Sequence, residues 1–342
     1  MAKKTLILLA LLFLVISCQT REKWHTSTVF ALDTVCEIRL FCSTPSFKSA
    51  QQEIHRIFSE IETLFSPGAE NYSSTLVLTL FRTARKVYDD SSGCFDITVG
   101  PLSRAWGFRN DSHYIPAPEH LQAILRLIGM EKIKEEAGTL ILVPGMELDW
   151  GGIAKGLGIG LASQAVIKMG VENGFINAGG NLYCWGKNPD KEPWKVGIKH
   201  PRKNGFLGVL SISQAGAATS GDYQRYFEAD GVRYHHIFDP RTGYPAQGKQ
   251  SVTVIGPEPV LCDALSTALF VAPKPEKILE KYPEYGAVIV DSKGSLKIIG
   301  KKYPFHHSTE HRPEETRAKF KGIWVHVPEF AFCLIFEAQG ER

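Results

Sequence analysis

Residues 148–156 have the sequence Leu148-Asp149-Trp150-Gly151-Gly152-Ile153-Ala154-Lys155-Gly156, an apolar, strand-like run followed by paired glycines and a helical pattern that opens with a lysine. Paired glycines let the backbone approach a ligand closely, and the first turn of a helix offers unpaired N–H groups to an anion. The stretch therefore predicts an anion-binding turn, and a plain tight connection between strand and helix is the alternative. No Rossmann site is predicted, because Leu161 stands where the third glycine of a dinucleotide fingerprint belongs.

The hydrophobic pattern on both sides of this stretch mixes helices and strands without strict alternation. Helical spacing covers residues 47–65, 76–88, 121–127 and 154–169. Strand-like patterns cover residues 29–41, 139–143, 175–177, 194–198, 208–212, 217–219, 232–238, 251–255 and 286–290. Because several strands follow one another through short turns, the pattern favours an α+β fold over a doubly wound parallel sheet.

The N-terminus has the features of an export signal. Lys3 and Lys4 precede an apolar run over residues 6–16, which is too short to cross a bilayer core of ~30 Å as a helix. Val15-Ile16-Ser17-Cys18 resembles a bacterial lipobox, although Ile16 occupies a position that usually holds a small residue. We predict a signal peptide over residues 1–17, lipidation of Cys18 and a lipid-attached linker over residues 18–27.

This interpretation makes the protein an exported lipoprotein, anchored by its lipid at the inner membrane and facing the periplasm. A cleaved soluble signal and an uncleaved anchor are the alternatives, and both also place the protein outside the cytoplasm. Removing residues 1–17 takes away two lysines and no acid, which leaves 39 − 2 = 37 Lys and Arg against 36 Asp and Glu. Because basic and acidic residues are nearly equal in number, we predict no nucleic-acid-binding surface.

The remaining cysteines predict buried free thiols. Several of them lie within apolar runs, which favours buried thiols over the disulfides that an exported chain could also form. They are Cys36, Cys42, Cys94, Cys184, Cys262 and Cys333. Residues 301–342 differ from the rest of the chain, since they are basic and rich in histidine before an apolar run. This extension could be an added strand, a membrane-surface contact or a poorly folded tail.

A second informative segment is Leu261-Cys262-Asp263-Ala264-Leu265-Ser266-Thr267-Ala268. If a helix starts here, Asp263 and Thr267 lie one turn apart on the same face. A carboxylate and a hydroxyl placed in this way can share Mg²⁺, which prefers oxygen ligands and completes its shell with water and phosphates. In the alternative, Asp263 caps the helix and Thr267 faces the core.

The third segment, His235-His236-Ile237-Phe238-Asp239-Pro240-Arg241-Thr242-Gly243, ends a strand-like run in a strong turn signal. Strand alternation directs one histidine toward the core and the other away from it. A histidine held near a turn can act as acid or base near neutral pH, or it can be purely structural. Nearby, Thr219-Ser220-Gly221-Asp222-Tyr223 offers hydroxyls and an aromatic ring suited to a nucleotide.

Taken together and in this order, these segments resemble the ApbE-type flavin transferases, also called FAD:protein FMN transferases. Seven ordered motifs between about residues 28 and 299 carry the resemblance. They are Ala31-Leu32-Asp33-Thr34, Gly93-Cys94-Phe95-Asp96-Ile97-Thr98-Val99-Gly100-Pro101-Leu102, residues 149–156, Ile176-Asn177-Ala178-Gly179-Gly180-Asn181-Leu182, and residues 219–223, 236–243 and 263–267. The resemblance implies one transferase domain over residues 28–300, with mixed, largely antiparallel sheets and flanking helices.

The same resemblance implies a magnesium-dependent enzyme that splits the pyrophosphate of FAD and moves FMN onto a threonine or serine hydroxyl, releasing AMP. Some relatives mainly hydrolyse FAD to FMN and AMP. The implied acceptor is an exported or membrane protein, such as a subunit of a membrane redox pump. By position, the resemblance assigns Mg²⁺ to Asp263, Thr267 and the carbonyl of Ala154, and catalytic roles to His236 and Asp263. It assigns the FAD pocket to Leu32, Asp33, Thr34, Lys155, Asn181 and Tyr223.

Three positions depart from the family pattern. Leu32-Asp33 stands where methionine-glycine or methionine-aspartate is common, and Gly160 stands where an aspartate is usual. After Ser66-Pro67, the chain runs through Ser74-Thr75 into a helical pattern without the asparagine that lines the flavin site in the family. A lipoprotein that carries FAD with little turnover is therefore the alternative function. A purely structural lipoprotein would leave the ordered motifs unexplained.

Overall fold

The computed structural model describes residues 21–110, 112–300 and 302–307, together with three short strands at 317–320, 323–326 and 333–335. The predicted signal peptide and the predicted lipidation site at Cys18 lie outside the described residues. Within the described part of the chain, no helix combines the length and the apolar character that a membrane crossing requires.

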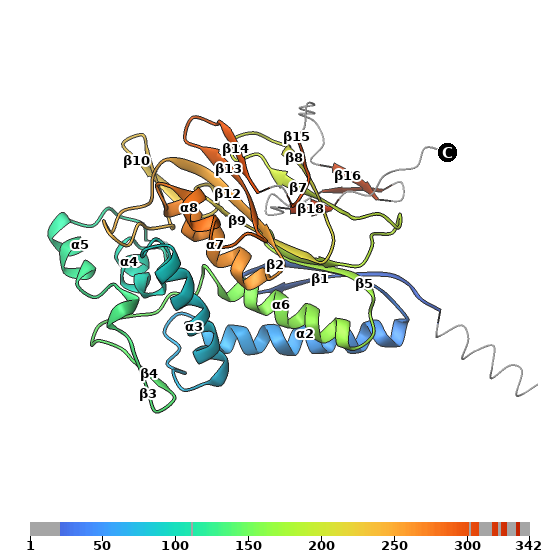
Figure 1. Cartoon of the computed structure of the whole chain (residues 1–342), viewed down its shortest axis with the longest axis horizontal. Coiled ribbons are helices and arrows are strands. Elements are labelled where there is room, and N and C mark those ends of the chain that lie inside the picture. Colours follow the sequence, from blue (N-terminus) through green and yellow to red (C-terminus); the bar gives the residue numbers. More distant parts are fainter. Residues whose placement is uncertain are drawn as a thin grey trace, which may run out of the picture.

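The centre of the molecule is an eight-stranded sheet in the order β1-β2-β5-β6-β9-β12-β13-β14, and each neighbouring pair runs antiparallel. Its strands are β1 (Lys23–Ala31), β2 (Thr34–Cys42), β5 (Asn173–Ala178), β6 (Asn181–Trp185), β9 (Ala215–Gly221), β12 (Lys249–Gly256), β13 (Gly286–Asp291) and β14 (Leu296–Ile299). Antiparallel pairing with helices laid against one face confirms the predicted α+β class (Figure 1).

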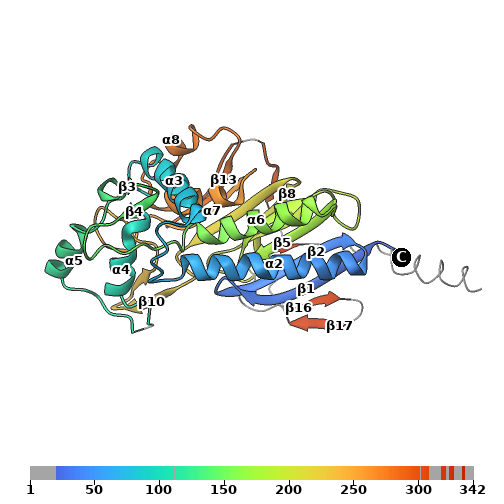
Figure 2. The same cartoon turned by 90° about the horizontal axis from the view of Figure 1, so that it is seen from below.

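Both faces of the central sheet are covered. Helices α2 (Thr44–Phe65), α6 (Ala154–Lys168) and α7 (Pro259–Val271) cover one face, with α3 (Thr75–Asp90) beside α7, and Figure 2 shows α2 and α6 side by side. A four-stranded sheet covers the other face, in the order β15 (Phe305–His307), β8 (Phe206–Ile212), β7 (Trp194–Lys199) and β18 (Cys333–Ile335). Neighbouring residues therefore enter different cores, Ile176 toward the helices and Phe175 toward the second sheet.

The longest helix shows how local sequence produces this layer. Ser43 caps α2 by accepting a hydrogen bond from the N–H of Ser46, and Pro45 lies in its first turn. Residues at helical spacing then form the buried stripe Phe47, Ala50, Ile54, Ile57, Phe58, Ile61 and Phe65. Each fully buried isoleucine or phenylalanine in such a stripe contributes about 1.5–3 kcal/mol. The stripe therefore holds α2 against the sheet.

A lobe at one end of the molecule carries the shorter elements and contains a third core that includes Trp106 and Phe108 (Figure 1). The elements are η1 (Ile97–Val99), α4 (Gly100–Ala105), α5 (Pro118–Leu125), η2 (Met130–Lys132), and the hairpins of β3 (Lys134–Glu136) with β4 (Thr139–Ile141) and of β10 (Tyr226–Ala229) with β11 (Val232–His235). Elsewhere lie α8 (Pro275–Leu279) and the hairpin of β16 (Arg317–Phe320) with β17 (Ile323–His326).

The single strand predicted over residues 29–41 is wrong, because β1 and β2 form a hairpin that turns at Leu32 and Asp33. Both turn residues have left-handed backbones, with φ of 54° and 58°. Tight hairpin turns of this kind usually contain Asn-Gly or Asp-Gly, so Leu-Asp gives no turn signal. The alternation of apolar residues continues across the turn, which is why the pattern resembled one strand.

The strand predicted over residues 139–143 is present as β4, but it does not enter the glycine pair. β4 ends at Ile141, and the chain from 142 to 153 forms turns and irregular backbone. The predicted strand over residues 232–238 ends at His235. In the extension after residue 300, β15 pairs with β8 and β18 pairs with β7, so these two pieces are added strands.

The thiol prediction is confirmed for the cysteines whose side chains are described. Cys36, Cys42, Cys94, Cys184 and Cys262 are all buried thiols that form no disulfide. The side chain of Cys333 lies outside the described part of the structure.

Candidate functional site

The site centres on the contact between α6 and α7. Gly156 in α6 donates its backbone N–H to Oδ2 of Asp263 in α7 at 2.9 Å. A side-chain carbon on Gly156 would stand 2.8 Å from both Cβ of Asp263 and Cα of Val260, and closer still to the carbonyl oxygen of Pro259. Glycine is therefore what allows the two helices to meet here. Since α7 begins at Pro259, Asp263 lies inside the helix, and the capping alternative is wrong.

The anion that the structure places at the first turn of α6 is a carboxylate of the chain itself. The N–H of Ala154 donates to the carbonyl of Trp150 at 2.9 Å, and the N–H of Gly151 donates to Asp149 at 2.9 Å. With Gly156 bound to Asp263, three of these groups already have partners within the chain. A helix N-terminus favours negative charge, and the carboxylate that fills this role at α6 is Asp263.

Thr267 faces the paired glycines. A side-chain carbon on Gly152 would stand 3.2 Å from Oγ1 of Thr267 and 3.2 Å from the ring of Phe95. The hydroxyl of Thr267 also lies 3.1 Å from that of Ser220 in β9. Thr267 is half-buried, whereas its neighbour Ser266 is fully buried, so the core-facing alternative for Thr267 is wrong. Four of the sequence motifs thus meet around this hydroxyl.

The charge on Asp263 is costly in this environment. Burial raises the pKa of Asp263, and the charge of Lys155, the N–H of Gly156 and the nearby amide of Asn181 oppose the rise. Asn181 is itself 4% exposed, and its Nδ2 makes no hydrogen bond with correct geometry in this structure. A buried carboxylate beside an unpaired amide donor is the arrangement expected where a ligand and a cation complete the site.

His235 and His236 have the two different environments that strand alternation predicted. His235 is 3% exposed, and its Nε2 donates to the carbonyl of Ala246 at 2.8 Å, which makes it structural. His236 is half-buried, and its Nδ1 lies 3.2 Å from the carbonyl of Arg225. Because a carbonyl oxygen only accepts, Nδ1 of His236 carries the proton and Nε2 presents a lone pair.

The imidazole of His236 is neutral at pH 7. Burial lowers the pKa of His236 to about 3, and the charges of His235, Arg225 and Lys155 lower it further. The charge of Lys155 acts on both His236 and Asp263, so the three side chains belong to one region.

The predicted flavin-pocket residues lie on elements that border this region. Leu32 is 7% exposed, and its Cδ1 lies 3.3 Å from where Gly158 of α6 would carry a side-chain carbon. Thr34 packs in the same way against Gly179, at 2.5 Å, while Asp33 is exposed. The ring of Tyr223 covers Gly221 at the end of β9, at 2.5 Å from the equivalent position. Lys155 donates to the carbonyl of Gly151 at 3.0 Å.

Asp149 and Ser103 organise the glycine turn, and the sequence interpretation did not assign them a role. One oxygen of Asp149 accepts from the N–H of Gly151, and the other accepts from the hydroxyl of Ser103 at 2.6 Å. The N–H of Asp149 donates to the carbonyl of Ile97 at 2.6 Å. An aspartate two residues before a turn N–H is a local signal that could have identified this role.

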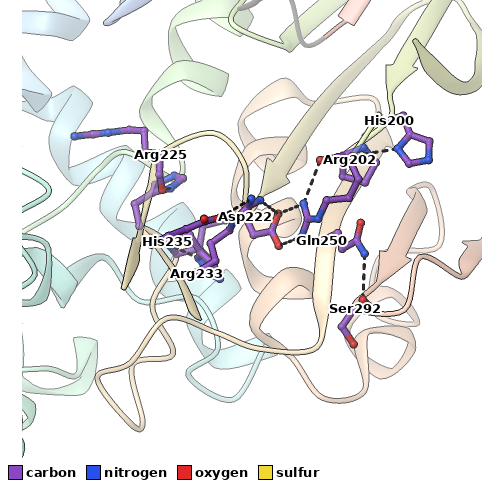
Figure 3. Close-up of polar contacts among 12 residues, drawn as sticks. His200, Arg202, Asp222, Arg225, Arg233, His235, Gln250 and Ser292 are labelled. Carbon is purple, nitrogen blue, oxygen red and sulfur yellow. Dashed lines mark hydrogen bonds and ion pairs between the residues drawn. The ribbon is translucent and has the colours of Figure 1, made fainter. Parts of the chain in front are cut away.

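A second carboxylate, Asp222, ties the hairpin of β10 and β11 to the rest of the molecule (Figure 3). It is 7% exposed and accepts from both terminal nitrogens of Arg202, one of them at 2.7 Å. Arg233 of β11 approaches the same carboxylate at 3.8 Å. Arg202 lies between β7 and β8, so one buried charge joins the second sheet to the hairpin that precedes His236.

The donors around Asp263 suit a hard cation. Among the described residues, no three His, Cys, Asp or Glu side chains cluster as a metal site would require. The donors that the structure places at the start of α6 are the carboxylate of Asp263 and, facing the glycine pair, the hydroxyl of Thr267, and both are oxygen ligands. This set fits Mg²⁺ and does not fit zinc, which prefers nitrogen and sulfur.

The chain is similar in sequence and in fold to known proteins. A model of the ApbE family matches residues 32–289. The FAD:protein FMN transferase of Vibrio cholerae is 32% identical over 291 residues, which span 78% of this chain and 86% of that protein. The one from Treponema pallidum is 28% identical over 324 residues, spanning 83% and 90%. The ApbE protein from Thermotoga maritima has a TM-score of 0.75 at 30% identity, covering 82% of this chain and 97% of its own.

Proposed function

Because this chain belongs to the ApbE family, we propose that it transfers FMN from FAD to a threonine or serine hydroxyl of an exported or membrane protein and releases AMP. One observation carries the proposal. A buried carboxylate and a hydroxyl of α7 meet the start of α6 and the glycine pair, and the buried amide of Asn181 adjoins that carboxylate, although their motifs are far apart in the sequence. The charge of Lys155 acts on both Asp263 and the neutral imidazole of His236.

Asp263, Thr267 and the carbonyl of Ala154 would hold Mg²⁺. When bound, the ion neutralises charge that builds on the phosphate oxygens during phosphoryl transfer. The N–H of Gly156 keeps one oxygen of Asp263 fixed toward α6, which leaves the other free for a further ligand. Lys155 adds positive charge at the same place, and its ammonium has donors to spare beyond its bond to Gly151.

His236 would act as the general base. Its Nε2 takes the proton from the acceptor hydroxyl while the oxygen forms a bond to the FMN phosphorus. The bond from that phosphorus to the bridging oxygen breaks, and AMP leaves with the electron pair. A base that is already neutral at pH 7 needs no prior deprotonation, and the bond from Nδ1 to Arg225 keeps Nε2 as the acceptor.

The flavin nucleotide would lie against the turns that border the metal site. Leu32, Asp33 and Thr34 supply one wall, and the ring of Tyr223 supplies a stacking surface. Asn181 is buried beside Asp263, and its amide would donate to a phosphate or ribose oxygen. These contacts orient the pyrophosphate between the cation and His236.

The setting of the reaction follows from the N-terminus. We propose that Cys18 is lipidated and anchors the enzyme at the inner membrane, facing the periplasm, where it would meet its acceptor. A subunit of a membrane redox pump is the acceptor class that fits this location. When water replaces the acceptor hydroxyl, the same site would hydrolyse FAD to FMN and AMP.

Mass spectrometry of an acceptor tests this function. An unflavinylated redox-pump subunit domain with one target threonine is incubated with FAD, Mg²⁺ and the mature chain. We expect a mass gain equal to FMN on that threonine, and none after adding EDTA or with Asp263→Ala. Intact FAD that stays bound without any adduct would instead identify a flavin carrier.

A further inference from the structure

The turn between β1 and β2 adopts a backbone that its residues disfavour. Leu32 and Asp33 both have positive φ, a region that costs non-glycine residues free energy because Cβ crowds the following carbonyl. Such a conformation persists only where the surrounding structure holds it. The question is therefore which contacts hold this turn.

Glu62 of α2 supplies the polar contact. Its Oε1 accepts a hydrogen bond from the backbone N–H of Leu32 at 2.7 Å, across 30 residues of sequence. Hydrogen bonds to an ionised carboxylate are roughly twice as strong as those between neutral groups. The Leu32 side chain, buried between Gly158 and Ile61, supplies the apolar contact.

The held turn leads directly to the site. Thr34 packs on Gly179, and the turn at Gly179 leads to Asn181, which lies beside Asp263. A shift in the backbone of Leu32 therefore moves the wall formed by Asp33 and Thr34. Glu62 has no other assigned role, and it lies on α2, outside the elements that carry the metal and the base.

We infer that Glu62 is a positioning residue for flavin-nucleotide binding, which acts by holding the Leu32–Asp33 turn in its left-handed conformation. This inference rests on the proposed function, because it assigns the turn to FAD. Glu62 touches neither substrate nor metal. Its loss weakens FAD binding and leaves the chemical step intact once FAD is bound.

Four proteins test the inference: the wild type, Glu62→Ala, Glu62→Gln and the control Glu60→Ala. Glutamine keeps an oxygen that can accept from Leu32, whereas alanine leaves that N–H unpaired. Glu60 lies on the same helix, is 48% exposed and pairs with Arg56 at 3.1 Å. Dissociation constants for FAD come from quenching of flavin fluorescence, and kcat is measured at saturating FAD. Hydrogen exchange at the Leu32 amide reports on the turn directly.

Glu62→Ala should weaken FAD binding by about tenfold or more, with kcat within about twofold of wild type and faster exchange at Leu32. Glu62→Gln and Glu60→Ala should resemble the wild type in all three measurements. Unchanged FAD affinity in Glu62→Ala would overturn the inference, and so would equal losses in Glu62→Ala and Glu62→Gln. A wild type that binds no FAD would instead refute the proposed function, on which the inference depends. If Glu62→Ala does not fold, Glu62→Gln provides the test. FAD binding as tight as in the wild type supports the inference, and weaker binding overturns it.

Discussion

Gly156→Ala should damage catalysis much more than stability. The new side-chain carbon would lie 2.4 Å from the carbonyl oxygen of Pro259 and 2.8 Å from Asp263 and Val260, where ordinary contact begins at 3.4 Å, so α6 and α7 must separate by about 3.4 − 2.4 = 1.0 Å. Overpacking of this kind costs about 1–3 kcal/mol, and helix propensity returns up to about 1 kcal/mol. We therefore expect a net loss of about 0–2 kcal/mol in unfolding free energy.

The same displacement acts on the site. It moves Asp263 away from the start of α6, and misplacement of about 1 Å can cost about 100-fold in rate. We expect FMN transfer to fall by about 10–100-fold, measured as the initial rate of acceptor labelling, with unfolding followed by circular dichroism in urea.

Gly160→Ala is the matched control on the same helix. Its side-chain carbon would lie 3.9 Å from the nearest atoms of Pro259, so no helix movement is needed. It should keep full activity and gain up to about 1 kcal/mol in stability. The reasoning is refuted if Gly156→Ala transfers FMN as fast as Gly160→Ala does.

Three further predictions concern buried ionisable groups. His236→Gln should lower the transfer rate by about 100-fold or more while FAD still binds. The wild-type rate should not fall between pH 8 and pH 6.5, because the pKa of His236 lies below that range. A wild-type rate that halves near pH 6.5 would argue against His236 as the base. Asp222→Ala should lower the unfolding free energy by about 2 kcal/mol, because it leaves Arg202 and Arg233 without their shared partner. Urea titration measures this, and an unchanged midpoint of unfolding would contradict the prediction. Burial raises the pKa of Asp96 from 3.8 to about 6, so the folded state holds this proton more tightly and stability is lost as pH rises from about 4 to 6. Asp96→Asn should remove that loss, so its unfolding free energy at pH 8 should exceed that of the wild type by about 2–3 kcal/mol. Equal unfolding free energies at pH 8 would show that Asp96 ionises without cost.

The sequence predicts the class of fold because its signals are local. Helical spacing in α2 and strand-like runs in β12 and β13 follow from which side chains face the core, and the structure confirms these elements. The hairpin of β1 and β2 escapes such reasoning, since Leu32 and Asp33 carry no turn signal and hold a strained backbone only through tertiary contacts. Backbone strain that is stabilised by distant residues cannot be recognised from the local sequence.

The site shows the same division between local and long-range information. The order of the motifs identifies the family, and strand alternation separates His235 from His236. The bond between Gly156 and Asp263 joins residues 107 positions apart, so no spacing rule could reveal that α6 already has its anion. A phosphate was predicted there because the sequence shows a free helix start and not the carboxylate that occupies it.

The most direct test of the account counts products in a single turnover. Mature enzyme in excess over FAD is mixed with Mg²⁺ and the redox-pump acceptor domain, and AMP and the FMN adduct are quantified together by liquid chromatography and mass spectrometry. The account predicts one adduct on the acceptor hydroxyl for each AMP released. AMP without adduct would show that water, and not the protein hydroxyl, is the acceptor, and the transferase assignment would then be wrong.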